Sequence, residues 1–209
     1  RAFIAKESAS VFGLDFPFGL PRALVQAASW EDFALSFPRR FANPEEFRAS
    51  CLVESGIEQR RVTDRESRTP FSACHPRIYR QTYYGIRDVL SPLVRDRLVC
   101  VLPMQPALPD RPWLLEICPA SSLKQAGLYL HYKGRTKEHL AARERILAWT
   151  EKAGPLSIPT PALRSAILTD SQGDALDSVI AAFAVFRALR TGLERDRNCA
   201  YALEGYIYV

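Results

Sequence analysis

Long apolar runs are missing from this chain of 209 residues. The longest uninterrupted one extends from Val179 to Phe186, far short of the roughly 20 residues that a membrane-spanning helix needs. A secretory signal peptide is not visible either. We therefore expect a cytoplasmic protein that does not enter a membrane. The sequence begins at Arg1 and not at a methionine, so we also expect further sequence upstream.

Paired cysteines, grouped histidines and glycine-rich loops are missing as well. The five cysteines include no C-x-x-C pair and their number is odd, which argues against a disulfide framework and a zinc knuckle and predicts reduced thiols. His75, His131 and His139 show no metal-ligand spacing. No G-x-x-x-x-G-K-[ST] or G-x-G-x-x-G loop occurs, which argues against nucleotide phosphotransfer.

Lysine is scarce among the charged residues. The 28 basic residues comprise 23 Arg and only 5 Lys, and with 23 acidic residues the net charge is +5. Arginine binds phosphate bidentately, but a GC-rich genome produces the same bias, so the charge leaves a nucleic-acid partner open. With 47% hydrophobic and 24% charged residues, the composition is that of a globular protein and excludes wholesale disorder.

Strand patterns alternate with helix patterns, which predicts an α/β fold. We expect one N-terminally incomplete domain over residues 1–209, without an internal boundary. The Arg-rich residues 60–76 read as a loop or the start of a helix. The expected strands cover residues 10–16, 97–102 and 113–118 with a short extended segment at 206–209, and the expected helices cover 22–37, 41–48, 77–93, 136–153 and 173–193.

Four carboxylates stand at unusual places in this pattern. Asp15 and Glu116 interrupt apolar strands near their carboxyl ends. Asp174 and Asp177 lie three residues apart at the start of a buried helix, so both project from one face. Each has a structural explanation of its own: a helix dipole, a turn cap or an ion pair with arginine. Taken together, they predict a bound divalent cation, a basic partner or both, because unpaired carboxylates in an apolar setting cost free energy that a positive charge offsets.

Five short blocks follow one another in the order known from domain-of-unknown-function family 429. Residues 15–21 (DFPFGLP) resemble its IDxPxGLP block. Residues 115–120 (LEICPA) and 132–134 (YKG) resemble its EvyPA and YKG blocks. Residues 173–182 resemble its DDalDAlvaA helix, and residues 204–208 (EGYIY) its closing EGwIy. Because the blocks span nearly the whole chain, the resemblance is fairly specific.

That family is regarded as ribonuclease H-like and is predicted to contain nucleases. The resemblance implies a mixed five-stranded sheet flanked by helices, with acidic residues on the first strand, the fourth strand and the last helix. Asp15 would be the fourth-strand acid, and Asp174 and Asp177 the helix pair, as in Holliday-junction resolvases of the RuvC type. Glu116 would assist from the fifth strand. The family's first strand, with an Asp of its own, has no counterpart here, so we expect the N-terminal strands to be missing from this chain.

The resemblance implies metal-dependent cleavage of DNA or RNA. Asp15, Asp174 and Asp177 would bind Mg²⁺ or Mn²⁺ and, together with Glu116, hydrolyse a phosphodiester bond. Basic side chains would contact the phosphates of the substrate. The residues that we expect in this role are Lys133, Arg61, Arg65 and Arg143.

Two other hypotheses remain open at this point. A ribonuclease H-like scaffold could serve as a non-catalytic nucleic-acid-binding or regulatory module, or the acids could pair with the Arg-rich segment in a structural or metabolic protein. Tyr83, Tyr84 and Trp113 could stack on bases, although helical spacing favours core packing for Tyr83. Resolution of junctions would require a homodimer.

Overall fold

A computed structural model describes residues 1–7, 9–52, 58–193 and 200–209. Its centre is a small open sheet with the order β1-β3-β2, in which β4 also pairs with β3. All strand pairs among the described residues are parallel. The strands are β1 (Val11–Leu14), β2 (Cys100–Leu102), β3 (Trp113–Ile117) and β4 (Ile207–Tyr208). The predicted α/β class and the strands near residues 10–16, 97–102 and 113–118 are therefore confirmed.

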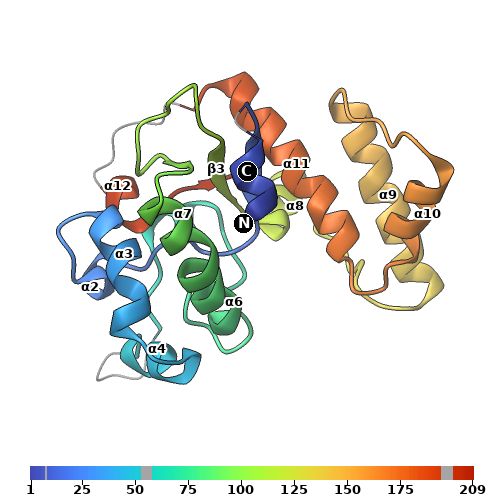
Figure 1. The fold of residues 1–209 in the computed structure, drawn as a ribbon. Helices are drawn as coiled ribbons and strands as arrows, with labels where there is room; N and C mark the ends of the chain where they lie inside the picture. The colour runs from blue at the N-terminus through green and yellow to red at the C-terminus, as the bar shows by residue number, and fades with distance from the viewer. Residues whose placement is uncertain (8, 53–57, 194–199) are drawn as a thin grey trace.

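The central strand β3 contributes to two cores in alternation. Leu114 belongs to an aromatic-rich core with helices of the first half of the chain, whereas Leu115 and Ile117 belong to a second core that includes α11. Successive side chains of a strand point to opposite faces, so the apolar run WLLEI is buried on both sides of the sheet. Helices therefore flank both faces (Figure 1).

The helices are mostly short. Gly13 on β1 lets the longest of them, α11, pack closely, because a Cβ at this position would lie 2.8 Å from side-chain atoms of both Ile117 and Val185. The helices of the described residues are α1 (Ala2–Lys6), α2 (Arg22–Val25), α3 (Trp30–Arg40), α4 (Pro44–Ser50), α5 (Val62–Glu66), α6 (Tyr79–Tyr84), the π-helix η1 (Gly85–Leu90), α7 (Ser91–Arg95), α8 (Pro119–Gln125), α9 (Lys137–Ala153), α10 (Pro161–Thr169), α11 (Asp174–Thr191) and α12 (Tyr201–Glu204).

The helix predictions need correction, because α1, α8, α10 and α12 lie outside the expected ranges and one expected helix is divided. The helix expected over residues 22–37 is divided into α2 and α3, because Gln26 adopts a left-handed conformation with φ 48° and Ser29 caps the start of α3. Helix α10 was not predicted, although Thr160 caps it through its side chain and Pro161 occupies its first position. Both are recognised start signals, which the prediction did not use at this position.

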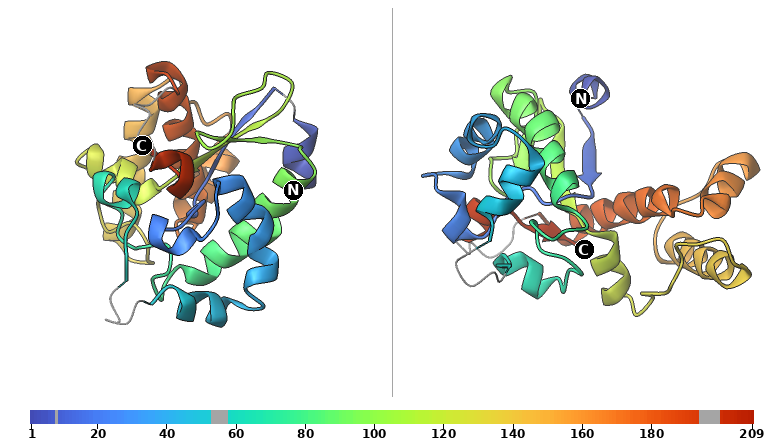
Figure 2. Two further views of the ribbon diagram at one scale, coloured as in Figure 1. Left: turned by 90° about the vertical axis from the view of Figure 1, so that its left-hand side faces the viewer. Right: turned by 90° about the horizontal axis from the view of Figure 1, so that it is seen from below.

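Helices α9 and α10 form a pair that packs on the side of α11 away from α3 and α4 (Figures 1 and 2). A third core joins them to α11 and includes Ile146, Ile167 and Ile180. The segment between α8 and α9 contributes Leu128 and Tyr132 to the same core. The pair thereby supports the segment that carries the YKG residues 132–134.

Within the part of the chain that the structure describes, no helix is both long enough and apolar enough to cross a membrane.

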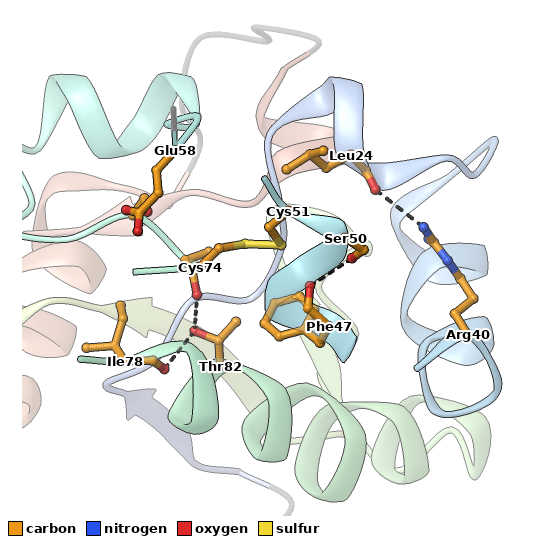
Figure 3. Close-up of a disulfide and its surroundings, with 11 residues drawn as sticks. Leu24, Arg40, Phe47, Ser50, Cys51, Glu58, Cys74, Ile78 and Thr82 are labelled. Carbon is orange, nitrogen blue, oxygen red and sulfur yellow. Dashed lines mark hydrogen bonds between the residues drawn. A yellow bond between two sulfur atoms is a disulfide. The ribbon is translucent and has the colours of Figure 1, made fainter. Parts of the chain in front are cut away.

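A disulfide bond joins Cys51, directly after α4, to Cys74 (Figure 3). The prediction of reduced thiols is thus wrong for this pair, because residues 23 positions apart in sequence meet in the fold. Nearby, the Thr82 hydroxyl donates to the carbonyl of Ala73 at 2.8 Å. Cys100 and Cys118 are free thiols, and Cys199 lies outside the described residues.

Cys74→Ala is expected to lower the free energy of unfolding by about 3 kcal/mol, because the denatured chain regains the freedom of the closed loop. Equilibrium urea unfolding without reductant measures the change. Wild-type protein treated with a thiol reductant should fall to the value of the variant, and the variant should not respond to the reductant. Identical unfolding of oxidised and reduced wild-type protein would contradict the expectation.

Candidate active site

A cavity of about 430 Å³ lies where β1 and β3 end next to the first turn of α11. The register pairs Leu14 with Glu116, so Asp15, which follows β1, and the end of β3 are at the same edge of the sheet. The carboxyl ends of parallel strands are where ligand sites form in open α/β sheets. The cavity wall also includes parts of residues 69–71, 77–81 and 129–133.

Asp15 presents a carboxylate without a protein partner to this cavity. No hydrogen bond or ion pair from a described residue reaches its side chain, whereas its backbone carbonyl accepts from the Gln81 side chain. Asp15 is solvent-exposed, but it stands in a concave surface where protein displaces part of its hydration. This desolvation and then the negative charge of Asp177 raise the pKa of Asp15 to about 7, against the opposing charge of Lys133.

Asp177, in the first turn of α11, is the second carboxylate of the cavity. It accepts hydrogen bonds from the Tyr132 hydroxyl at 2.5 Å and from the Lys133 ammonium at 2.7 Å. Burial and the charge of Asp177 raise the pKa of Tyr132. Burial disfavours the charged form of Lys133, but the hydrogen bond and charge of Asp177 outweigh it and raise the pKa of Lys133. The pair is therefore a charged Lys133–Asp177 contact beside Asp15.

Asp174 lies at the rim of this arrangement. Its side chain is 83% exposed and is 4.0 Å from the Lys133 ammonium, whereas only 12% of the Asp177 side chain is exposed. The D-x-x-D spacing places both acids in the first turn, yet only Asp177 lines the cavity. Among residues 1–7, 9–52, 58–193 and 200–209, no three His, Cys, Asp or Glu side chains are grouped closely enough to hold a metal ion.

Glu116 and Arg61 form a buried ion pair at the cavity floor. Arg61 Nη1 donates to Glu116 Oε2 at 2.8 Å and Arg61 Nη2 to Glu116 Oε1 at 2.5 Å, while the Phe18 backbone N–H also donates to Oε2. Arg61 binds Asp64 as well. Burial opposes the charge of Arg61, but Glu116 and Asp64 outweigh it and raise its pKa. Both groups are committed to each other, so this geometry does not favour the catalytic role expected for Glu116 or the substrate contact expected for Arg61, and both stay predictions.

Arg143 and Arg65 also differ from the expected phosphate contacts. Arg143 is buried and donates to the backbone carbonyls of Tyr132, Gly134 and Leu168 at 2.5, 3.0 and 2.7 Å. It holds the chain on both sides of Lys133. Arg65 is exposed, donates to the Arg60 carbonyl and does not line the cavity.

Of the expected base-stacking residues, none lines the cavity. Tyr83 is in the core, as its helical spacing indicates, and its hydroxyl donates to the Phe41 carbonyl. Sequence reasoning missed several cavity residues, among them Phe71, Arg77 and Tyr129. Phe71 and Tyr129 lie in connecting segments without periodicity, and Arg77 lies just before α6, so no pattern in the sequence marks them as site residues.

Comparison of the chain with protein-family models, with curated proteins and with solved structures finds no match.

Proposed function

We propose that this cavity is the active site of a divalent-metal-dependent nuclease that hydrolyses phosphodiester bonds of DNA or RNA. The observation that carries the proposal is the unpartnered Asp15 carboxylate, which faces the Asp177–Lys133 pair at the edge of a parallel sheet. The ribonuclease H-like fold belongs to the same proposal. It is supported by two parallel neighbouring strands, the first followed directly by Asp15, and by the long helix α11, whose first turn carries Asp177.

Two carboxylates offer the oxygen donors that a hard divalent cation such as Mg²⁺ or Mn²⁺ prefers, so water and substrate would have to supply the other ligands. Asp15 and Asp177 would hold it, because both offer carboxylate oxygens to one cavity and repel each other without a cation. Asp174, at the rim, is the third carboxylate near Lys133. When bound, such an ion supplies water activation and neutralisation of phosphate charge.

The side chains already present can orient a phosphodiester. Lys133 offers a charged ammonium that reaches Asp177 from a half-exposed position, so it can also contact a phosphate oxygen. Tyr132 and Arg143 fix the position of this segment from the buried side. As a ligand of the cation, Asp15 would position the water that the ion activates.

A cleavage assay with the whole chain tests the proposal. We expect labelled DNA or RNA to be cut in the presence of Mg²⁺ or Mn²⁺, and EDTA to stop the reaction. Calorimetry should show Mg²⁺ binding that Asp177→Asn weakens and Asp110→Asn, at an exposed position outside the cavity, does not. Protein that neither binds Mg²⁺ nor cuts any nucleic acid contradicts the proposal.

One observation favours a second candidate, a non-catalytic nucleic-acid-binding module. Lys133 already supplies a cation to Asp177, as a binding site without metal would require. This module would bind nucleic acid without cleavage, and its affinity would fall steeply with salt because phosphate contacts release counterions. The homodimer and the cytoplasmic location expected from the sequence stay predictions.

A further inference from the structure

We infer that the cavity accepts one unpaired nucleotide, so that the substrate is a single strand or a frayed strand end and not the interior of a duplex. This inference rests on the proposed function, because it concerns the substrate of the same site. It is carried by the size of the cavity and by the side chains of its wall.

The first argument is space. Asp15 and Asp177 line a concave cavity of about 430 Å³. This volume is near the lower end of the roughly 300–1,000 Å³ of small-ligand pockets. A phosphate that reaches both carboxylates must bring its own nucleotide into the cavity. In a duplex interior, pairing and stacking hold that nucleotide in place, and its removal costs free energy.

The second argument is the aromatic wall. Tyr129 lines the cavity with 53% of its surface exposed, and the Lys124 ammonium lies 4.9 Å from its ring centroid. The ammonium covers one face of the ring, and the exposed part of the ring is a platform on which any base can stack. In paired, stacked DNA the base faces are covered, so this platform is useful only for an unpaired base.

The third argument is the placement of charge. Phe71 also lines the cavity, with the His75 ring stacked on it at 4.3 Å and the Arg77 guanidinium 5.5 Å from its centroid. Arg77 is exposed and is a second cavity cation besides Lys133. Arg61 is neutralised by Glu116 and Asp64. The cavity charges outside that group, Lys133, Arg77, Asp15 and Asp177, together with the exposed ring match the phosphates and the base of a single nucleotide.

Binding and cleavage of matched probes test the inference. The probes are a fluorescein-labelled oligothymidylate and a blunt, GC-rich DNA hairpin of equal nucleotide count that is closed by a non-nucleotide linker, so that it has no unpaired loop. Anisotropy is measured in EDTA and cleavage in Mg²⁺. We expect binding of the single strand to be at least about tenfold tighter. Tyr129→Ala should weaken it about five- to tenfold or more, while Tyr129→Phe retains it. The matched control is Tyr84→Ala, at an exposed tyrosine that does not line the cavity.

The outcomes separate the inference from the function on which it rests. Equal binding and equal cleavage of strand and hairpin, with Tyr129→Ala unchanged, overturn the inference and leave the nuclease proposal standing. Preferential, Tyr129-dependent binding of the single strand without cleavage of either probe supports the inference for the site and overturns the nuclease proposal.

Discussion

Asp15→Asn is expected to reduce Mg²⁺-dependent cleavage by about a thousandfold or more. The substitution keeps the shape of the side chain but removes the charge that faces Asp177 and Lys133 across the cavity. Loss of a metal-binding carboxylate removes several kcal/mol of transition-state stabilisation, and each 1.36 kcal/mol corresponds to about tenfold in rate. Single-turnover rates on a labelled strand measure the effect. Asp110→Asn, an exposed aspartate outside the cavity, is the matched control and should leave the rate unchanged.

The same substitution should stabilise the metal-free fold at pH 8. The folded-state pKa of Asp15 is raised from 3.8 to about 7, so the native state binds this proton more tightly than the denatured state. Its ionisation therefore destabilises the fold increasingly between about pH 4 and 7, and fully above pH 7. Because Asp15 is exposed, solvent screening reduces the effect to about 1–2 kcal/mol. The contribution vanishes below about pH 4.

Urea unfolding in EDTA at pH 8 and pH 4 measures this difference. We expect Asp15→Asn to be more stable than the wild type at pH 8 and equally stable at pH 4. Such a variant, inactive but more stable, shows that the lost activity does not come from unfolding. A variant that loses stability at pH 8 would mean that the Asp15 carboxylate has a structural partner.

Arg61→Met is expected to lower the free energy of unfolding by about 3–5 kcal/mol, because it leaves the buried carboxylates of Glu116 and Asp64 without their cation. Equilibrium urea unfolding with circular dichroism measures the loss. Arg65→Met, at an exposed arginine of α5, the short helix that follows Arg61, should change stability by less than about 0.5 kcal/mol.

A double variant tests whether the loss comes from unpaired charge. Arg61→Met combined with Glu116→Gln removes both members of the principal pair, so its destabilisation should be smaller than the sum of the two single changes. Simple additivity of the two changes would mean that Arg61 stabilises the fold through packing alone and would falsify the ion-pair explanation.

The strands and acids of the site were accessible to sequence reasoning because their signals are local. Apolar runs marked β1 and β3, and a carboxylate at the end of each run marked their shared edge. The start of α11 was marked in the same way by a long apolar helix with Asp177 in its first turn. These patterns depend on periodicity within one element, which the sequence displays directly.

The roles of the basic residues were not accessible, because they depend on contacts between distant segments. Arg61 meets Glu116 across 55 positions and the carbonyl of Glu204 across 143. The sequence of the Arg-rich residues 60–76 is equally compatible with a solvated surface and with a buried ion pair. The disulfide was missed for the same reason, since cysteine spacing says nothing of which elements the fold brings together.

The contacts of Arg143 affect how a function can be transferred between relatives. This residue does not line the cavity, yet it binds the carbonyls on both sides of Lys133 and anchors them to the end of α10 through Leu168. A relative that keeps Asp15, Lys133 and Asp177 but lacks this arginine would have the same cavity residues without the hydrogen bonds that hold the Lys133 ammonium in place. A comparison limited to cavity residues would then assign the same activity to both proteins, although they differ at the arginine position on α9.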